Sequence, residues 1–424
     1  MRNLFWKGLF HVTALFLNIF IARHFEASIS GRLYYTIAFF SFILLVLSFS
    51  LESGIIHFSA KKEIPVSRLY GFSILWSVVA GIMVFAIIFF FFNHERSLSF
   101  SQILLSAVSF ICGSLLMTFC AGFFYAENNY RTPNLISIFV NLLLILIIPF
   151  GGTSIVSGIN DDNYFYIYFA SFLVQGIALA FLAKLKYVNT NAFQFPNSRE
   201  FRMLFQYVSV AFIGNIVFFL LCRIDYFFVT QFSSPAQLGN YIQVTKLGQL
   251  LLVIPSIMAT VIFSHSSHRT LMEEPAKLQR LCRLMTSLFV MISIVLIVSG
   301  KWVFPWIFGN DFKDMYAAML NYLPGFFSLS IVTLLAAYIA GKGMLFHNIY
   351  ASLIALVVVV IGDLLFIPNY GIKGAAAVSS VAYFICMLYL LWIFVARLNT
   401  SLSDFFLIKK SDLKSIKSIF IKSE

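Results

Sequence analysis

Twelve long apolar stretches, separated by short polar loops, fill this chain almost from end to end. Each stretch is about 18 to 27 residues long, which is enough for a helix to cross the hydrocarbon core of a bilayer. The composition agrees with this, because 60% of the residues are hydrophobic and only 11% are charged. Charged residues make up about a quarter of an ordinary soluble domain. The sequence therefore predicts a multi-pass membrane protein.

Helices are the expected form of these spans, because lipid offers no hydrogen bonds to the backbone and strands of a membrane barrel would alternate in polarity. The first span follows Arg2 and Lys7 in the manner of a signal peptide, but no cleavage pattern of small residues follows it, so we expect it to be retained. The expected spans are 3–24, 33–60, 69–92, 101–126, 134–150, 163–183, 203–231, 238–264, 281–303, 318–340, 346–368 and 372–396.

The distribution of Lys and Arg predicts the orientation, because positively charged short loops stay in the cytoplasm. With the N-terminus inside, about 21 of the 29 basic residues lie in cytoplasmic loops and about six lie outside. Both termini are therefore expected in the cytoplasm. This asymmetry also explains most of the net charge of +12 without a nucleic-acid partner.

Short sequence echoes indicate that the chain is duplicated. Ser30-Gly31-Arg32-Leu33-Tyr34 precedes the second span, and Leu238-Gly239-Asn240-Tyr241 precedes the eighth. Six spans in each repeat would give both halves the same topology, related by an axis along the membrane normal. We therefore expect an all-α integral membrane protein with about 12 transmembrane helices in two six-helix lobes around a central cavity. The expected parts are an N-terminal lobe (1–184), a cytoplasmic connection (185–202), a C-terminal lobe (203–397) and a basic amphipathic cytoplasmic tail (398–424).

Three charged residues lie at one membrane depth in the seventh and eighth spans. Counted from the short outer loop at 1.5 Å per residue, Asp225, Lys246 and Arg223 lie about 10, 12 and 13 Å deep. Ionisable groups at such depth are expensive and are functional candidates by default. Asp225 can reach Lys246 across the hairpin, which leaves Arg223 either to snorkel or to bind an anionic headgroup through its planar fork.

Two further candidates come from the first two spans. A polar stripe runs along the second span, which we expect to be one continuous helix, and comprises Tyr34, Ser41, Ser48, Glu52 and Ser59. Glu52 is a candidate cavity or coupling group. His11 and Asn18 are aligned on the first span, and Arg23 lies at its outer end. Asp363, near the outer end of the eleventh span, is expected to pack against Lys373 or a neighbouring helix end. We find no metal-ligand spacing, disulfide framework or catalytic set in the sequence, and no cofactor is expected.

Three segments carry a family resemblance: IPNYGIKGAA at 367–376, the Gly-Asn-Tyr entry to the eighth span at 239–241, and SLESGI at 50–55. They resemble polysaccharide-repeat-unit flippases, the O-antigen and capsule translocases of the multidrug, oligosaccharidyl-lipid and polysaccharide exporter superfamily. The resemblance covers the whole chain in length, span count and spacing. It implies an inner-membrane flippase that moves an isoprenoid diphosphate-linked oligosaccharide to the outer leaflet by alternating access.

The resemblance also implies which residues meet the substrate. Arg223 and Lys246, with Arg23, Asn18 and His11 of the first span, become candidates for substrate binding, while Glu52 and Asp225 become cavity or coupling candidates. Expected partners are the lipid-linked oligosaccharide, membrane lipids and proteins of polysaccharide assembly. Coupling to H⁺ or Na⁺ stays open, as do the sugars and the oligomeric state.

Two other functions were weighed. A cation-coupled multidrug exporter of the same superfamily would need an acidic cavity, which Glu52 allows but Arg223 and Lys246 oppose. A membrane glycan polymerase or ligase would need a sizeable external loop with acid, base or nucleophile, whereas the longest external loops have only about a dozen residues. The chain is therefore expected not to be an enzyme.

Overall fold

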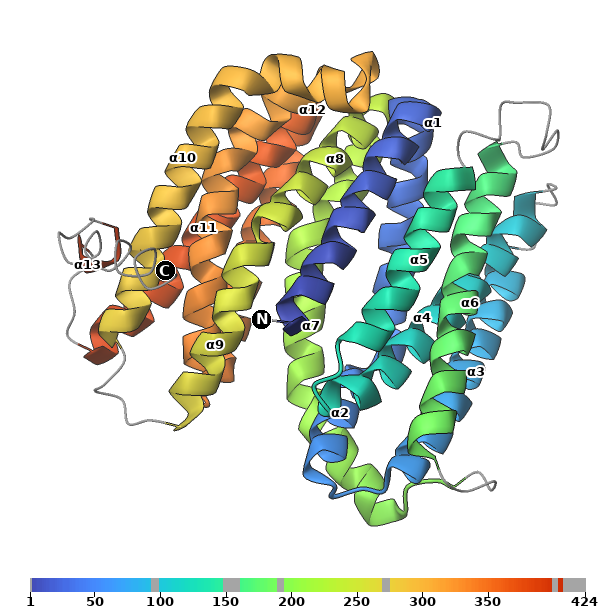
Figure 1. The fold of residues 1–424 in the computed structure, drawn as a ribbon. Helices are drawn as coiled ribbons and strands as arrows, with labels where there is room; N and C mark the ends of the chain where they lie inside the picture. Colours follow the sequence, from blue (N-terminus) through green and yellow to red (C-terminus); the bar gives the residue numbers. More distant parts are fainter. Residues whose placement is uncertain are drawn as a thin grey trace, which may run out of the picture. The chain divides into compact units, whose positions relative to one another are not determined.

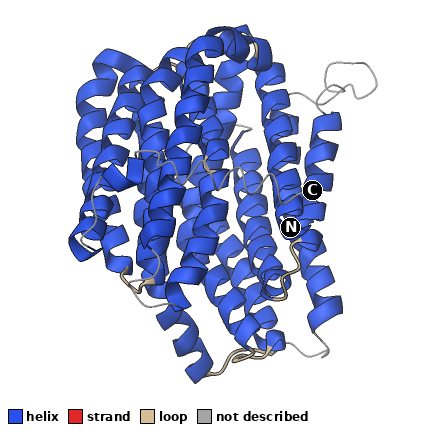
Figure 2. Ribbon diagram, turned by 60° about the vertical axis from the view of Figure 1, so that its left-hand side comes forward, coloured by secondary structure: helices blue, strands red, loops and turns tan. Residues whose placement is uncertain are grey.

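The computed structural model describes residues 2–92, 99–147, 161–188, 194–268, 275–398 and 403–406. Within these ranges the elements are helices and short loops, with no strand (Figure 2). The expected all-α fold class is confirmed. The predicted tail from 398 onward lies almost entirely outside the described residues, apart from a short helix α13 (Ser403–Phe406).

The predicted spans map onto helices where the chain is described, although the second and the eighth are each divided between two helices (Figure 1). Nine described helical segments are long and apolar enough to cross a membrane. The helix over 345–398 holds two predicted spans, the helix over 2–48 holds the first span and the start of the second, and each continues across a single non-helical residue. The helices are α1 (Arg2–Ser48), α2 (Leu51–Lys61), α3 (Val66–Phe92), α4 (Ser99–Ala126), α5 (Arg131–Ile147), α6 (Asp161–Tyr187), α7 (Ser198–Phe232), α8 (Pro235–Leu251), α9 (Val253–His268), α10 (Pro275–Phe308), the 3₁₀ turn η2 (Asn310–Phe312), α11 (Met315–Gly341) and α12 (Leu345–Leu398).

Two helices turn sharply at a residue with positive φ. α1 changes direction at Glu26, where φ is 60°, and α12 does so at Gly371, where φ is 54°. Glycine adopts this conformation at little steric cost, so Gly371 fits the tight junction between the eleventh and twelfth spans. α12 therefore contains two successive predicted spans, and α1 contains the first span and the start of the second.

The second span is interrupted, which the sequence did not predict. α1 ends at Ser48 and α2 begins at Leu51, and between them Phe49 and Ser50 have φ of 49° and 55°. The expectation of one continuous helix over 33–60 was therefore wrong. The polar stripe that this helix would have carried does not run straight past Ser48.

The eighth span is also divided, into α8 and α9 at Leu252. Pro255 lies in the first turn of α9, and a continuous helix would place its ring against the carbonyl of residue 251, four residues earlier, and would lack its N–H.

The chain forms two compact units, which are described separately. Unit 1 comprises residues 1–26 and 33–216, and unit 2 comprises residues 27–32 and 217–424. This division falls inside α7, whereas the sequence predicted lobes of 1–184 and 203–397 joined by a connection at 185–202. The predicted lobe limits stay a prediction.

Two glycines from the sequence echo contact each other within unit 2. A Cβ on Gly31 would lie 2.7 Å from the backbone nitrogen of Gly239, and a Cβ on Gly239 would lie on the carbonyl oxygen of Ala27. Only glycine permits so close an approach of two backbones. Equivalent positions of the two sequence repeats therefore pack against each other.

The described part of the segment predicted to be the cytoplasmic connection is bonded to α3 within unit 1. Ser67 Oγ donates a hydrogen bond to Gln194 Oε1 at 2.9 Å, and Arg68 Nη1 lies 2.7 Å from Glu200 Oε1. Gly71 leaves room for the Gln194 carbonyl, which a Cβ would meet at 2.2 Å. From Gln194 onward the connection is therefore anchored rather than slack.

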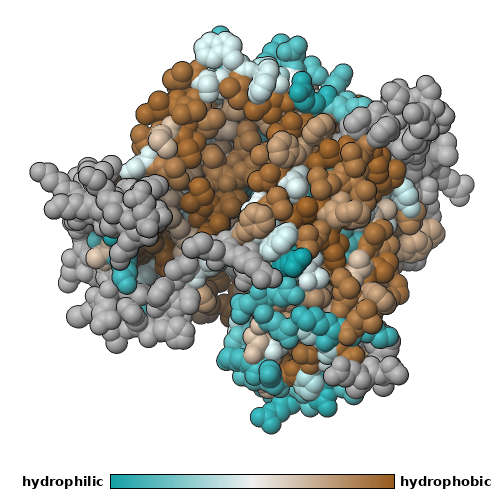
Figure 3. Space-filling view, in the orientation of Figure 1, coloured by the Kyte–Doolittle hydropathy of each residue, from teal (hydrophilic) through white to brown (hydrophobic). Residues whose placement is uncertain are grey.

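Hydrophobic side chains cover the flanks of the helices, and hydrophilic residues gather at helix ends (Figure 3). One hydrophilic region lies at the lower end of unit 1 in this view, where α2 ends and α7 begins. Exposed aromatic residues near a predicted outer boundary include Trp302 and Trp306 on α10, at 68% and 76% exposure. This distribution suits helices that face lipid along their length.

Candidate functional site

Arg223 lies on α7 in unit 2 and is held by a tyrosine one turn further along. Its Nη1 donates to the hydroxyl of Tyr226 at 2.6 Å, and the guanidinium lies 5.0 Å from the centre of that ring. A weaker bond of 3.4 Å reaches the carbonyl of Cys222. Among the described residues no carboxylate forms an ion pair with this arginine. The guanidinium is therefore positioned by a neutral aromatic group and keeps donors for another acceptor.

Lys246 lies on α8 close enough to Arg223 for the two positive charges to interact. The sequence placed both residues at one membrane depth, and both belong to unit 2. Two cations at one level repel each other, so their proximity favours an anion between or beside them.

Asp225 is fully buried, and its donors differ from the one that the sequence predicted. The hydroxyl of Tyr241 donates to Oδ2 at 2.5 Å, Ser379 Oγ donates to Oδ2 at 3.4 Å, and the backbone N–H of Tyr226 donates to Oδ1 at 2.9 Å. The expected ion pair with Lys246 is not one of these bonds. Hydroxyl and backbone donors therefore stabilise the carboxylate where an ammonium was expected.

The sequence assigned Asp363, on α12, to packing and did not place it among the functional-site residues. It is fully buried, and neither carboxylate oxygen has a hydrogen-bond partner among the described residues. It lies within electrostatic range of Asp225, and both carboxylates act on Tyr241, while Lys373, its expected partner, is exposed. A signal was present in the sequence, because eight residues separate Asp363 from Gly371, which places it about 12 Å deep, level with Asp225.

Buried tyrosines surround the two carboxylates. Tyr241, Tyr322 and Tyr383 are at most 2% exposed, and the hydroxyls of Tyr322 and Tyr383 lie 3.3 Å apart. The hydroxyls of Tyr226 and Thr245 are also hydrogen-bonded to each other. No sequence signal separated these tyrosines from ordinary packing residues in apolar spans.

Together these residues form a polar cluster in the core of unit 2, defined here as the carboxylate cluster: Asp225, Asp363, Tyr241 and Ser379. Among the described residues there is no group of three or more His, Cys, Asp or Glu side chains that could hold a metal ion. Two carboxylates with hydroxyl oxygens beside them are nevertheless hard oxygen ligands, suited to a proton or a small monovalent or divalent cation.

The interruption in the second span creates a separate polar feature in unit 1. The carbonyl of Leu47 accepts a bond from Trp76 Nε1 at 2.7 Å, and Ser50 Oγ accepts one from Asn215 Nδ2 at 3.0 Å. Phe49 stacks on Phe212 with ring centres 4.1 Å apart. Non-helical backbone at membrane depth is tolerated only where protein or water satisfies it, and here the side chain of Trp76 on α3 satisfies the Leu47 carbonyl.

Glu52 lies in the first turn of α2, directly after this interruption. It is partly buried, and its Oε2 has no hydrogen-bond partner among the described residues. The partial positive charge of a helix N-terminus favours a carboxylate at this position.

The candidates of the first span belong to unit 1. His11 is partly buried, Asn18 is buried and Arg23 is exposed. They are therefore in a different unit from Arg223, Lys246 and Asp225, and their role in substrate binding stays a prediction.

No family model and no curated protein sequence matches this chain. Solved structures do match it. A lipid II flippase, MurJ, in an inward-closed conformation superposes with a TM-score of 0.74 at 16% identity, over 100% of this chain and 93% of that chain. An inward-facing multidrug resistance transporter of the MATE family of the MOP superfamily gives 0.70 at 13% identity, covering 93% and 95%.

A MATE transporter from Vibrio cholerae gives a TM-score of 0.68 at 14% identity, covering 95% of this chain and 98% of that one. At these identities the likeness concerns the fold. The chain therefore shares its fold with these flippase and multidrug-transporter structures.

Proposed function

We propose that this protein is a flippase that moves an isoprenoid diphosphate-linked oligosaccharide, an O-antigen or capsular repeat unit, from the inner to the outer leaflet of a bacterial cytoplasmic membrane. The observation that carries the proposal is Arg223, a guanidinium at membrane depth that is held by Tyr226 and pairs with no described carboxylate. A planar fork of donors matches the oxygens of a phosphate, and Lys246, within electrostatic range of Arg223, offers further N–H donors.

In the proposed mechanism, the sugars and diphosphate pass through a hydrated cavity between the predicted lobes while the isoprenoid stays in lipid. Rocking of one lobe against the other would expose the site first to the cytoplasm and then to the outside. A membrane potential of 100 mV, negative inside, favours outward movement of each negative charge by about 2.3 kcal/mol. The protein's part is to lower the cost of desolvating the headgroup.

The carboxylate cluster suits a coupling step. Asp363 has no described hydrogen-bond donor, so uptake of a proton or a small cation would relieve an expensive buried charge. Asp225 and Asp363 interact with each other, so one uptake event would alter both. Asp225 would thereby act on Arg223, which lies within its electrostatic range on the same helix.

A cation-coupled multidrug exporter is the second candidate. The buried carboxylate pair of unit 2 favours it, and several of the solved structures with this fold are MATE transporters. The two functions predict opposite signs for the transported group, because Arg223 and Lys246 would repel a cationic drug.

Lipid extraction from a strain that lacks the gene tests the proposal. We expect a lipid-linked oligosaccharide to accumulate in the inner leaflet and surface polysaccharide to disappear, and plasmid-borne wild-type protein to reverse both. Sensitivity to cationic drugs is measured in the same strain. Loss of drug resistance with normal surface polysaccharide would replace the flippase by the exporter.

A further inference from the structure

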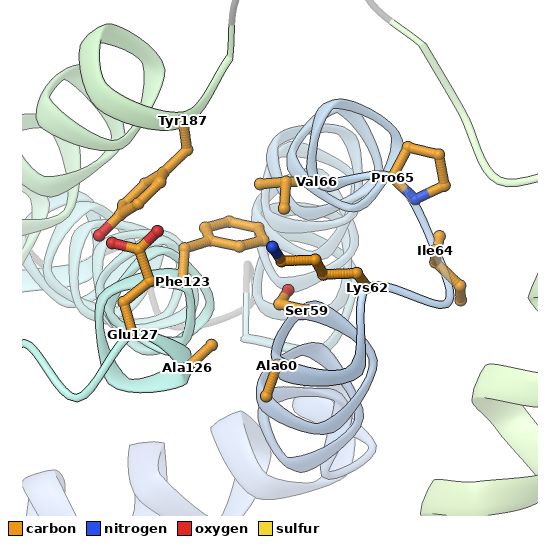
Figure 4. Close-up of a pocket in the computed structure, with 10 residues that line it drawn as sticks. All are labelled: Ser59, Ala60, Lys62, Ile64, Pro65, Val66, Phe123, Ala126, Glu127 and Tyr187. Atoms are coloured by element: carbon orange, nitrogen blue, oxygen red, sulfur yellow. The ribbon is translucent and has the colours of Figure 1, made fainter.

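A cavity of about 320 Å³ opens at the end of unit 1 where α2 passes into α3 (Figure 4). All the residues that line it belong to unit 1, whereas the carboxylate cluster belongs to unit 2. Ile64, Val66 and Phe123 supply apolar wall, and Ser59, Lys62 and Glu127 supply polar groups. Its volume falls at the lower end of the range of small-molecule sites, which are also mostly apolar with a few converging polar groups.

The basic residues around this cavity differ in their pairing. Lys61 lies 3.8 Å from Glu63, Arg68 lies 2.7 Å from Glu200, and Lys186 lies 3.2 Å from Glu127. Lys62 has no ion-pair partner among the described residues, and its ammonium points into the cavity toward Phe123 (Figure 4).

The charge of Glu127 in the wall is already compensated. Lys186 Nζ bonds to it at 3.2 Å and also donates to the hydroxyl of Tyr187 at 2.9 Å. Two ammonium groups and one carboxylate therefore leave one net positive charge at the cavity, and that charge is carried by Lys62.

Ser59 provides an independent sign of a ligand. It is only 8% exposed, lines the cavity, and its Oγ has no hydrogen-bond partner among the described residues. In Figure 4 the hydroxyl lies beneath the Lys62 side chain. Buried hydroxyls in apolar helices normally bond to the preceding turn, as those of Ser73 and Ser77 do on α3. The Ser59 hydroxyl is thus available to donate to an acceptor beside the ammonium.

The backbone directs Lys62 into the cavity. Lys62 caps α2 in the left-handed region with φ of 56°, and its N–H bonds to the carbonyls of Phe58 and Ser59. Glycine is the usual residue at such a cap, and lysine there costs about 1 kcal/mol. A substitution to glycine would therefore remove the ammonium and retain the cap.

We propose that this cavity binds a small ligand bearing a phosphate group, with the phosphate on Lys62 and Ser59 and an apolar or aromatic body against Phe123. A lysine ammonium and a hydroxyl supply a point charge and a donor of the kind that a phosphate oxygen accepts. This proposal is independent of the proposed transport function, because none of the residues that line the cavity belongs to the Arg223 site.

Two sources could supply this chemistry. The loop that carries Lys61, Lys62 and Arg68 is predicted to face the cytoplasm, so a soluble phosphate ester or the headgroup of an inner-leaflet lipid could enter. The experiment therefore uses one probe of each kind: phenyl phosphate, and phosphatidic acid in nanodiscs whose other lipid is phosphatidylcholine.

Full-length protein in phosphatidylcholine nanodiscs is titrated with phenyl phosphate by calorimetry, and phosphatidic acid retention is measured by native mass spectrometry. We expect at least one probe to bind the wild type, and Lys62→Gly to bind it about tenfold or more weakly, the loss of one charged hydrogen bond. Ser59→Ala should weaken binding less. Lys61→Gln, which removes the neighbouring paired ammonium, should bind as the wild type does.

The thermal unfolding midpoint separates binding from folding, because Lys62→Gly should unfold at or above the wild-type temperature. Binding of phenyl phosphate would identify a soluble ligand, and retention of phosphatidic acid alone would identify a lipid headgroup. Absence of binding by both probes, or unchanged binding by Lys62→Gly, would refute the proposal.

Discussion

In unit 2 the Asp225 carboxylate receives hydrogen bonds from two hydroxyls and a backbone N–H, whereas in unit 1 one oxygen of Glu52 receives none from the described residues. Asp225 is fully buried and Glu52 only partly so. The two acids also differ in their helices, since Asp225 lies within α7 and Glu52 lies in the first turn of α2.

The difference shows two ways of keeping an acid at membrane depth. Specific hydrogen bonds stabilise Asp225, so removing its carboxylate would leave the hydroxyls of Tyr241 and Ser379 buried without an acceptor. A helix N-terminus stabilises Glu52 diffusely, and the interaction is worth about 0.3 to 1 kcal/mol. Asp363 follows neither pattern, because it is fully buried without a described donor. An acid maintained in this way is expected to serve function at the expense of stability.

The largest effect on stability is expected from Asp225→Ala. Removal of this carboxylate leaves Tyr241 and Ser379 without their buried acceptor and should lower the free energy of unfolding by about 3 kcal/mol. Thermal unfolding of the purified protein in one detergent measures it. Asp225→Asn retains an acceptor oxygen and serves as the matched control with a smaller loss.

A double variant tests how Asp225 is stabilised. Since its donors are hydroxyls and a backbone N–H, adding Lys246→Gln to Asp225→Asn should not restore the stability lost by the single change. Recovery in the double variant would show that the Lys246 ion pair predicted from the sequence governs the site.

Asp363→Asn should change stability with the opposite sign. Replacing a buried, undonated carboxylate by a neutral isostere should leave the free energy of unfolding unchanged or raise it by about 1 kcal/mol, while transport falls. Unfolding and export of surface polysaccharide are measured in parallel. A loss of stability as large as that of Asp225→Ala would mean that Asp363 has a structural partner.

The smallest effect is expected from Glu52→Gln. The loss of charge at the α2 N-terminus should lower the free energy of unfolding by less than about 1 kcal/mol. Comparison with Asp225→Asn under identical conditions isolates the difference between the two acids. Equal losses would remove the distinction drawn between them.

The sequence predicted the spans well, because apolar length alone determines what can cross a bilayer. It also placed Arg223 and Lys246 at one level, since helical rise converts residue counts into depth. The donors Tyr241 and Ser379 of Asp225 could not be predicted, because these residues, 16 and 154 residues away along the chain, come to it only through packing. The pairing of Asp225 with Lys246 stays a prediction.

The interruption at Phe49 and Ser50 could not be read from the sequence either. Neither Gly nor Pro occurs there, and the residues that bond to the interruption come from other helices: Trp76 donates to the Leu47 carbonyl and Asn215 donates to the Ser50 hydroxyl. The local sequence shows whether a helix break is unfavourable at a position. Hydrogen bonds from residues distant in the sequence determine whether the break is nevertheless stable.

Flipping by the purified protein tests the role of Arg223 most directly. The wild type, Arg223→Lys and Arg223→Ala are reconstituted into vesicles with a fluorescent isoprenoid diphosphate-linked sugar, and outward movement is followed by an external quencher. Equal incorporation and equal unfolding temperatures must be shown first. We expect partial activity from Arg223→Lys, which keeps the charge but loses the planar fork, and loss of most activity from Arg223→Ala. Wild-type flipping by Arg223→Ala would contradict the proposed anion site.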